Sequence, residues 1–513
     1  MVRSTFAGFS VARLAMSASQ TALNVVGQNV GNINTSGYTR QRLDLQSISP
    51  AGHSMVNSKY NISVGQGVMM TGVSQIRDPF LDIQYRNQLA EVGTVDAMDT
   101  ILDRIGDVFD ETSASKISSA LNNVISQLQN MSKPDTAGQD TYDTLVRSAM
   151  ETLVNLFHES AKDITDMKVE FVDRITGTEA QKIDSYLSDI LELNESIKNS
   201  QILGNPALEL MDQRNSLIDE LATYLPINVS YEELNVGGNV KVDTLKITFR
   251  DTDGNEHTLI DDNEKGTISV TGANGMPPLQ VQVTGVGAAT ATDVTDKLGE
   301  GVLKGYADML NKSGVYDDPN TDTKGIGFYE EYFNEFVNEF ATTLNNLNGA
   351  GGALFETSDG SPDFTAENIR VSEAWMSGQV HITTTTNPDS GTTGNESAYE
   401  NVQRMINALM SDRHSFTTAQ GEQVFEGTFL EAYTYLQNTQ ATERSSISAI
   451  LTNRTTVLNQ IADSKDSVSG VNLDEEVMSM MQYQQSYNAA ARLMTALDEI
   501  LDKLINNTGA VGR

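Results

Sequence analysis

Hydrophobic side chains recur every three or four residues near both ends of the chain. The C-terminal series consists of Met480, Tyr483, Tyr487, Ala490, Met494, Leu497, Leu501 and Leu504. The N-terminal series consists of Phe9, Ala12, Met16, Ser19, Leu23, Val26, Val30 and Ile33. This spacing places each series on one side of an α-helix and is the seam pattern of a coiled coil. The sequence therefore predicts one helix at each terminus, with the two seams as pairing surfaces.

Charge supports pairing of the two terminal helices. The first 45 residues carry four arginines (Arg3, Arg13, Arg40 and Arg42) against the single acidic residue Asp44. The C-terminal segment carries Asp498, Glu499 and Asp502, and three carboxylates, at positions 474–476, stand where the positive end of the helix dipole favours them. The alternative is that each terminal helix packs on the body of its own domain.

Longer helical repeats fill the middle of the chain. Apolar residues at helical spacing run from Leu153 to Ile197, which predicts a very long helix ending near Pro206. A second long helix passes through Ile447 and Ile461. Shorter helical patterns occur at about 97–131, 208–224, 328–348 and 397–411. Residues 41–96 are irregular, apart from one strand or hairpin in "VGQGVMMTGVSQI". The pattern is typical of a helical bundle.

Between Leu225 and about Gly305 the spacing of hydrophobic residues changes from the three or four of a helix to the two of a β-strand. Leu245, Ile247 and Phe249 alternate with polar residues, and the pattern turns at 253–254 before it returns. We interpret this segment as a small β domain inserted into the bundle. We expect this domain to have its own core, so that removal of about 227–299 should leave the bundle folded.

These patterns together predict a mainly α protein. Its terminal helices pair as a coiled coil, its body is an elongated helical bundle, and a small β domain is inserted in that body. The predicted units are a terminal domain (1–60 and 466–513), a bundle (61–225 and 305–465) and an outer β domain (226–304).

Composition narrows the classes of function. The chain has 513 residues and a net charge of -35, which disfavours binding to nucleic acid or to anionic membranes. It contains no cysteine, so it has no disulfides and no thiolate metal ligands. No apolar run approaches the roughly 20 residues that span a bilayer. The N-terminus lacks the apolar core of a cleaved signal peptide, because polar residues and Arg13 interrupt it.

Catalytic and metal-binding patterns are not apparent. The five histidines have no ligand spacing. The segment "DTDGNE" from Asp251 resembles the start of a calcium loop, but Glu256 stands where that loop needs glycine, so a hairpin turn explains it better. We therefore expect no enzyme activity, no catalytic or metal-ligating residues, and no cofactor.

Two terminal motifs resemble a known family. They are "ALNVVGQNVGNINTSGYTRQ" from Ala22 and "SGVNLDEEVMSMMQYQQSYNAAARLM" from Ser469. Both are similar to motifs of the axial proteins of the bacterial flagellum, most closely to the hook-associated proteins of the hook–filament junction. The matching positions are Asn29, Asn32, Asn34, Gly37, Tyr38, Thr39 and Arg40, and then Asn472, Leu473, Asp474, Glu475, Glu476, Tyr483, Gln484, Gln485 and Tyr487.

The resemblance implies a structural subunit that joins hook to filament and supports filament assembly. It implies that the terminal helices line the inner tube of a ring of identical subunits. The implied assembly interface is Phe9, Met16, Leu23, Val26, Val30 and Ile33 with Met480, Tyr483, Tyr487, Met494, Leu497, Leu501 and Leu504. Implied partners are the hook protein, the second junction protein and an export chaperone on the C-terminal helix. The implied location is the extracellular flagellum, after type III export.

Two other functions fit parts of the sequence. Hook and rod proteins share the asparagine-rich N-terminal motif, although the long central helices favour the junction protein. The β insert could instead be a glycan-binding or hydrolytic module, which needs two carboxylates about 5 to 10 Å apart. Glu232, Glu233, Asp243, Asp251 and Asp253 would be its candidates, but acidic residues on a small β domain usually serve solubility.

Overall fold

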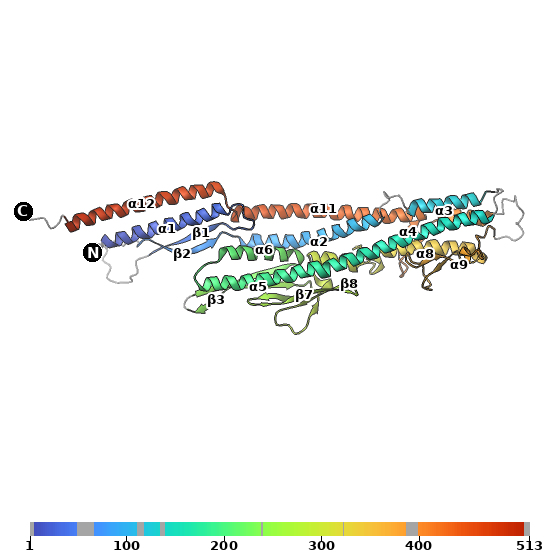
Figure 1. Ribbon diagram of the computed structural model, residues 1–513, viewed down its shortest axis with the longest axis horizontal. Helices are drawn as coiled ribbons and strands as arrows, with labels where there is room; N and C mark the ends of the chain where they lie inside the picture. Colours follow the sequence, from blue (N-terminus) through green and yellow to red (C-terminus); the bar gives the residue numbers. More distant parts are fainter. Residues whose placement is uncertain are drawn as a thin grey trace, which may run out of the picture.

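The computed structural model describes residues 5–48, 66–109, 117–133, 139–237, 240–321, 323–385 and 399–506. The molecule is a long rod, with both terminal helices at one end and the helical body extending from them (Figure 1). The β strands of the insert lie along one side of this body. No helix among the described residues is long and apolar enough to cross a membrane.

The terminal helices α1 (Thr5–Gly31) and α12 (Leu473–Asn506) lie side by side and run antiparallel (Figure 1). Small side chains allow the close approach, because Ala12 and Ala490 are both buried. A Cβ atom built on Gly8 would lie 3.1 Å from Leu497 Cδ1. The predicted pairing of the two termini is confirmed.

A β-hairpin covers another side of α1 (Figure 1). Strands β1 (Gln41–Ser47) and β2 (Val68–Gln75) pair antiparallel, with Leu43 opposite Val73 and a register shift after Asp44. The hairpin therefore crosses the boundary that we predicted at residue 60.

Helix α2 (Pro79–Phe109) corrects the prediction for residues 79–96, which we expected to be irregular. Proline is favourable at the first helical position, and the Asp78 carboxylate accepts a hydrogen bond from the Phe80 N–H at 2.9 Å. The buried face of α2 carries Arg86, Gln88 and Thr94 among its apolar residues. These polar side chains hid the helical period.

Long helices run the length of the body. Helix α4 (Gln139–Asp173) continues through a π-helical turn, η1 (Arg174–Glu179), into α5 (Ala180–Ile202), as the long apolar repeat predicted. Helix α11 (Phe429–Ser469) lies antiparallel on α2. Its first turn has a capping box between Thr428 and Glu431.

The remaining elements are shorter. The helices are α3 (Ile117–Met131), α6 (Leu208–Tyr224), α7 (Val302–Asn311), α8 (Ile326–Asn348), α9 (Glu373–Met376), α10 (Glu400–Met410), η2 (Thr295–Lys297), η3 (Gly314–Tyr316) and η4 (Gly349–Gly351). The insert contains a four-stranded sheet of β3 (Ile227–Gly237), β4 (Val240–Arg250), β5 (Glu256–Asp261) and β6 (Glu264–Lys265), and a three-stranded sheet of β7 (Thr267–Ala273), β8 (Met276–Thr284) and β9 (Thr292–Asp293). Two further hairpins are β10 (Phe355–Thr357) with β11 (Ile369–Val371), and β12 (His414–Thr417) with β13 (Gln423–Gly427).

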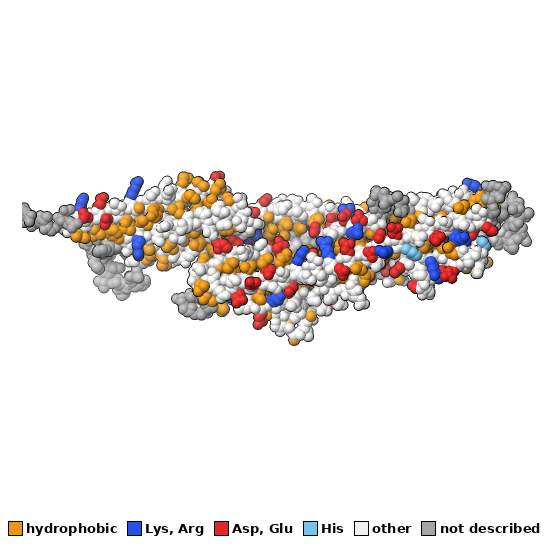
Figure 2. Space-filling model, viewed as in Figure 1, with side chains coloured by type: hydrophobic (Ala, Val, Ile, Leu, Met, Phe, Trp, Pro, Cys, Tyr) orange, Lys and Arg blue, Asp and Glu red, His pale blue; other side chains and the backbone are white. Residues whose placement is uncertain are grey.

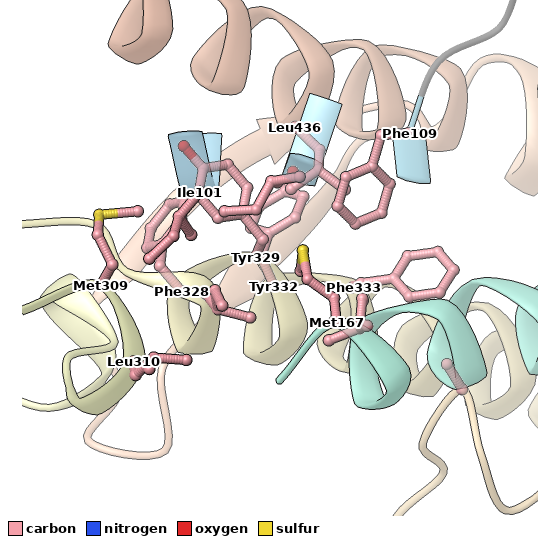
Figure 3. Close-up of a cluster of buried hydrophobic side chains, with 14 of the residues drawn as sticks. Ile101, Phe109, Met167, Met309, Leu310, Phe328, Tyr329, Tyr332, Phe333 and Leu436 are labelled. Atoms are coloured by element: carbon pink, nitrogen blue, oxygen red, sulfur yellow. The ribbon is translucent and has the colours of Figure 1, made fainter. Parts of the chain in front are cut away.

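Aromatic side chains of α8 form the centre of the body (Figure 3). Phe333 packs edge-on against Phe109 of α2 and Phe157 of α4, with ring centroids 5.8 Å apart in both pairs. Tyr332 donates a hydrogen bond to the Ala432 carbonyl of α11 at 3.1 Å. Because one helix contacts three long neighbours, the body is a true bundle with a shared core.

The β insert shares the core of the bundle. Ile183, Leu187 and Ile190 of α5 are fully buried and belong to the same continuous hydrophobic cluster as Leu245 and Ile247 of β4. Our expectation of a separate core for the insert is therefore wrong. The predicted hairpin turn at Asp251 is confirmed, since it joins β4 to β5 and its carboxylate accepts a hydrogen bond from the Asn255 N–H. The predicted fold class, mainly α with a small β insertion, is confirmed.

Candidate assembly site at the terminal helices

The N-terminal motif forms the turn that leaves α1. Asn32 donates from its side chain and from its backbone to the Gln28 carbonyl, both at 3.0 Å, which closes the last helical turn. Gly37 has a φ of 76°, a left-handed conformation that favours glycine. Ile33, which we assigned to the helical seam, lies beyond α1 in this turn and is 38% exposed, and Asn34 is also exposed.

Asn29 is the centre of a buried hydrogen-bond network. Its side-chain oxygen accepts from the Gln41 N–H and from the Tyr38 hydroxyl, both at 3.0 Å. Its side-chain nitrogen donates to the Gln41 carbonyl at 2.9 Å and to the Glu476 carboxylate at 3.1 Å. One amide therefore ties α1 to β1 and to α12.

Arg40 connects the same turn to the start of α12. Its guanidinium pairs with Glu475 at 2.6 Å and with the buried Glu476 at 2.7 Å. Its backbone N–H donates to the carbonyl of Ser469, the last residue of α11, at 2.8 Å. Asn472 caps α12 by accepting from the Asp474 N–H at 3.0 Å. The two terminal motifs are thus in direct contact.

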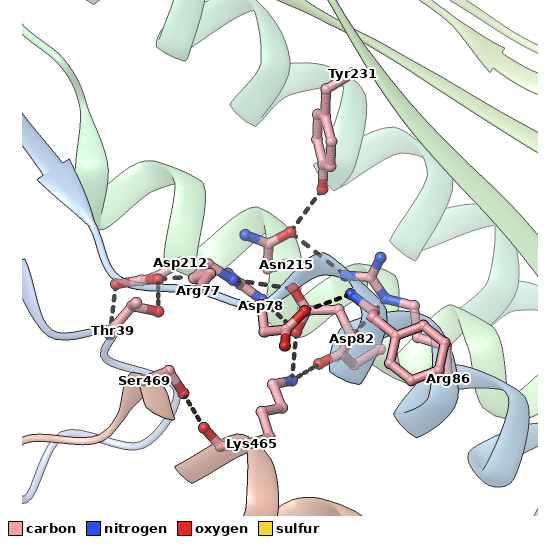
Figure 4. A network of polar contacts seen from close by, with 12 residues as sticks. Thr39, Arg77, Asp78, Asp82, Arg86, Asp212, Asn215, Tyr231, Lys465 and Ser469 are labelled. Carbon is pink, nitrogen blue, oxygen red and sulfur yellow. Dashed lines mark hydrogen bonds and ion pairs between the residues drawn. The ribbon is translucent and has the colours of Figure 1, made fainter. Parts of the chain in front are cut away.

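A second network fixes this turn to the body (Figure 4). The Thr39 N–H and hydroxyl donate to the Asp212 carboxylate of α6 at 2.9 and 2.6 Å. Burial raises the pKa of Asp212, although the hydrogen bonds from Thr39 oppose this. Burial would also raise the pKa of Asp82, but the hydrogen bonds and charge of Arg77 outweigh it and lower that pKa. Lys465 of α11 pairs with Asp82 at 3.4 Å and with Asp219 of α6 at 2.9 Å.

Sequence reasoning missed the partners that the body contributes. Asp212 and Glu209 occupy one face of α6, and Glu209 accepts from the side chains of Gln28 and Gln41 at 2.7 and 3.1 Å. A carboxylate pair at a spacing of three on a helix is a common surface pattern. Only the fold brings these two residues to the motif at Thr39.

The predicted seam lies between α1 and α12. Ala12, Val26 and Ala490 are buried. Most other predicted interface residues are partly buried, namely Phe9, Met16, Leu23, Val30, Tyr483, Tyr487, Met494, Leu497 and Leu501. Met480 and Leu504, at the two ends of the C-terminal series, are 36% and 48% exposed. Leu473, the first residue of α12, is 49% exposed. The seam residues therefore serve mainly the pair within one chain.

A second apolar row follows the exposed side of α12. It recurs at spacings of three and four and consists of the apolar residues Met478, Ala489, Leu493, Ala496, Ile500 and Leu504, with Gln482 and Gln485 at two of its positions. We call this row the outer stripe. Met478 is 59% exposed, Leu493 47% and Ile500 48%. Figure 2 shows hydrophobic side chains gathered over the terminal helices. Four large apolar groups on one exposed helix face indicate a surface that another molecule covers.

Charge is depleted along most of the terminal pair. Residues 5–31 contain one charged side chain, Arg13, and residues 477–497 contain one, Arg492. By contrast, 20% of all residues in the chain are charged. Depletion of charge, together with Met, Tyr and Arg, is the composition of an interface core. At the joint the anticipated charge pairing is present, because Arg40 pairs with Glu475 and Glu476 of α12; Arg42 instead pairs with Asp44, and Arg3 lies outside the described residues.

Three of the five carboxylates that we considered for a glycan site make contacts with neighbouring side chains. Asp243 accepts from the Gln201 side chain at 2.8 Å, and Asp251 accepts from the Asn255 side chain at 3.0 Å. Asp253 pairs with Lys297 at 2.8 Å. Among the described residues, no group of three or more acidic or histidine side chains is arranged to hold a metal ion.

Comparison with known families identifies the family of the chain. Residues 102–364, just over half of the chain, match the family described as the flagellar hook-associated protein FlgK helical domain. The chain belongs to the FlgK family of flagellar hook-associated proteins. Residues 9–39 match the flagella basal body rod protein family, and residues 466–507 match the C-terminal family of the basal body rod FlgEFG proteins. The first segment covers the N-terminal motif up to Thr39, and the second contains the whole C-terminal motif.

Full-length relatives agree with this family. The chain is 29% identical to flagellar hook-associated protein 1 of Bacillus subtilis, over 99% of this chain and 100% of the relative. It is 22% identical to flagellar hook-associated protein 1 of Salmonella typhimurium, over 96% of this chain and 98% of the relative. Because the rod families match only the two termini, the hook-or-rod alternative has less support than a hook-associated protein.

A solved structure shares the fold. The flagellar hook junction protein FlgK from Burkholderia pseudomallei superposes with a TM-score of 0.56. The match covers 75% of this chain and 100% of that chain, at 12% sequence identity. The architecture of the FlgK family thus persists at very low sequence identity.

Proposed function

We propose that this chain, a structural subunit of the flagellar hook–filament junction, self-assembles through its paired terminal helices. The observation that carries the proposal is the outer stripe of α12, which exposes Met478 and Leu493 within residues 477–497, where Arg492 is the one charged residue, and Ile500 just beyond them. Full burial of one such side chain contributes about 1.5–3 kcal/mol, so burial of the exposed half contributes about 1 kcal/mol per residue.

This modest energy per residue is sufficient for assembly because the same contact is repeated between all subunits. In a closed ring each subunit uses the same contact on both sides, so small contributions add up around the assembly. The seam cannot supply this contact alone, because Leu497 already packs on Gly8 of the same chain. We therefore assign the buried and partly buried seam residues to the pair within each subunit and the outer stripe, which includes Leu504, to contact between subunits. The terminal pairs would together form the inner tube.

The proposed assembly implies a set of partners. The hook protein would lie on one side of the ring and the second junction protein on the other, and the ring would serve as the platform for filament assembly. Before assembly, the exposed stripe of α12 needs a cover, which favours an export chaperone that binds the C-terminal helix. We place the assembled protein outside the cell, after export through the flagellar type III apparatus without a cleaved signal peptide. A net charge of -35 disfavours nucleic acid and anionic membrane as partners.

Imaging of flagella tests the proposal. The gene would be replaced by a variant with Leu493→Asp and Ile500→Asp, which places two carboxylates on the outer stripe. Burial of these charges in the assembly is unfavourable, whereas in the free subunit they face water. We expect complete hooks without filaments, and filament subunits in the medium.

The control carries the same charge change elsewhere. Ser269→Asp with Thr271→Asp adds two carboxylates to exposed positions of β7 and should leave filaments intact. Both variants must be detected outside the cell, so that a failure of export is not mistaken for a failure of assembly. Normal filaments on hooks that carry the exported outer-stripe variant would contradict the proposal.

A further inference from the structure

An open cleft separates the turn that follows α1 from the body. Residues 32–37, which we call the motif turn, form one wall of this cleft. The opposite wall consists of Tyr85 and Leu89 of α2, one face of α6 from Ser216 onwards, and the end of α11. The volume of the cleft is about 800 Å³. The motif turn therefore stands apart from the helices that lie opposite it.

The terminal unit, which we define as α1, the β1–β2 hairpin and α12, has no hydrophobic core in common with the body. Among the described residues, the core cluster of the body contains none of the side chains of this unit. The buried apolar residues Ala12, Val26 and Ala490 belong to α1 and α12, which pack on each other. Domains without a large apolar interface are expected to move relative to each other.

Polar contacts hold the terminal unit at one edge of the cleft (Figure 4). The Thr39 N–H and hydroxyl donate to the Asp212 carboxylate, near the start of α6. The Arg40 N–H donates to the Ser469 carbonyl at the end of α11. The cleft continues from these contacts along α6 as far as Thr223. The contacts thus form a possible pivot at one edge of an open space.

Two chain connections cross from the terminal unit to the body, and they lie close together. Residues 76–78 join β2 to α2, and residues 470–472 join α11 to α12. Lys465, near the end of α11, pairs with Asp82 in the first turn of α2 at 3.4 Å. Because a few connecting residues can absorb the change in backbone angles, two neighbouring connections allow the terminal unit to rotate as one body.

Gly470 is adapted to the open arrangement. Its backbone is extended between the two helices, with a φ of -74° and a ψ of 156°. A Cβ atom at this position would overlap the Asp466 carbonyl oxygen. A side chain at position 470 would therefore disfavour the open arrangement relative to one in which this connection has rotated.

Apolar groups on the two walls would meet if the cleft closed. Ile33 of the motif turn is 38% exposed. Leu89 on the opposite wall is only partly buried. Contact between them would remove apolar surface from water, which favours closure.

Polar groups on the two walls are also complementary. The motif turn supplies amide and hydroxyl donors, and the opposite wall supplies carboxylate acceptors. The donors are Asn34, Thr35 and Ser36, and the acceptors are Asp219, Glu220 and Asp466. Arg77 and Lys465 line the cleft as well, but each already pairs with carboxylates of the body.

We infer that the terminal unit pivots on this joint and that the motif turn closes onto α2 and α6. The structure shows the open position, in which Ile33 and Leu89 face the cleft from opposite walls. The inference goes beyond the proposed function, because it concerns a movement within the isolated subunit. Two positions of the joint would give the terminal helices two angles to the body, so one chain could adapt to neighbours of different geometry.

Distances between two spin labels test this movement in the full chain, which has no cysteine of its own. Ser36→Cys and Ser216→Cys place one label on each wall, at exposed serines. We expect two populations of distances, of which the shorter represents the closed cleft. The control pair is Ser196→Cys, at an exposed position of α5, with Ser216→Cys. Both of its labels lie in the body, so it should give one narrow population.

Two substitutions should shift the populations in opposite directions. Ile33→Asp removes the apolar contact and places a carboxylate opposite an acidic wall, so the shorter population should fall about fivefold relative to the longer one. Gly470→Ala disfavours the open arrangement, so the shorter population should grow. Leu203→Asp makes the same kind of change as Ile33→Asp at an exposed position outside the cleft, and it should leave the ratio unchanged.

Two results would overturn the inference. The first is a single population for the pair 36 and 216, as narrow as that of the control pair, in the chain with native Ile33 and Gly470. The second is a pair of populations whose ratio does not respond to Ile33→Asp, because closure of the motif turn onto Leu89 would then not explain them.

Discussion

The sharpest test of the joint is the substitution Asn29→Ala. The side chain is 1% exposed and makes four hydrogen bonds, to both backbone groups of Gln41, to the Tyr38 hydroxyl and to the Glu476 carboxylate. A buried polar group that loses its partner costs about 1–3 kcal/mol. Because Tyr38 and Glu476 can recover some contact with water or Arg40, we expect a total loss of about 3–5 kcal/mol from the terminal unit.

Hydrogen exchange measures this loss locally. Amides in α1 and α12 of the variant should exchange faster by roughly two to three orders of magnitude, because each 1.4 kcal/mol is a factor of ten. Amides in α8, whose core contains Phe333, should keep their protection. The matched control is Asn24→Ala, an exposed position on the same helix, where the change should stay within about 0.5 kcal/mol. Equal exchange of α1 in the two variants would refute the assignment of Asn29 as the centre of the joint.

Two further predictions concern the body. Burial would lower the pKa of His414, but its hydrogen bonds to Glu339 and to the Ala408 carbonyl outweigh this and raise it. The stabilisation is thus complete below the unfolded pKa of about 6.5 and is lost as pH rises through the higher folded value. Between pH 5.5 and pH 8.5 the urea midpoint should fall by more for the native chain than for His414→Gln. An equal fall in the two chains would contradict the assignment. Replacement of residues 227–299 by a short Gly/Ser linker should expose Ile183, Leu187 and Ile190, so the product should bind a hydrophobic dye. A soluble product that binds no dye would show that the insert is independent of the bundle core.

The sequence predicted the elements whose apolar period is regular. Leu187 and Phe171 belong to an uninterrupted helical repeat, and Leu245 to Phe249 alternate cleanly, so both the long helix and the insert were anticipated. The first half of α2 was missed because Arg86 and Thr94 occupy its buried face. Arg86 pairs there with Asp219 of α6, and Thr94 with Glu300, before α7. Partners so distant along the chain are invisible to a local pattern.

The sequence likewise identified only some of the residues of the candidate site. Resemblance to the family identified Arg40 and Glu476, and the structure brings them together. Nothing in the sequence pointed to Asp212, because the contact with Thr39 exists only once α6 lies beside the turn. The outer stripe was also missed. Its apolar residues are interrupted by Gln482 and Gln485, whereas the C-terminal seam series contains no glutamine and therefore dominated the pattern.

The accessibility of the outer stripe in the assembled flagellum tests the central claim most directly. A single cysteine would be placed on the stripe by Leu493→Cys, and on the exposed face of the insert by Ser269→Cys as a reference. The rate of maleimide labelling would be measured for each variant, first in the purified monomer and then in isolated flagella. Our account predicts that labelling at position 493 is fast in the monomer and strongly slowed in the flagellum, while labelling at position 269 is fast in both. Equal rates at position 493 in monomer and flagellum would contradict the claim that the terminal helices are the assembly surface.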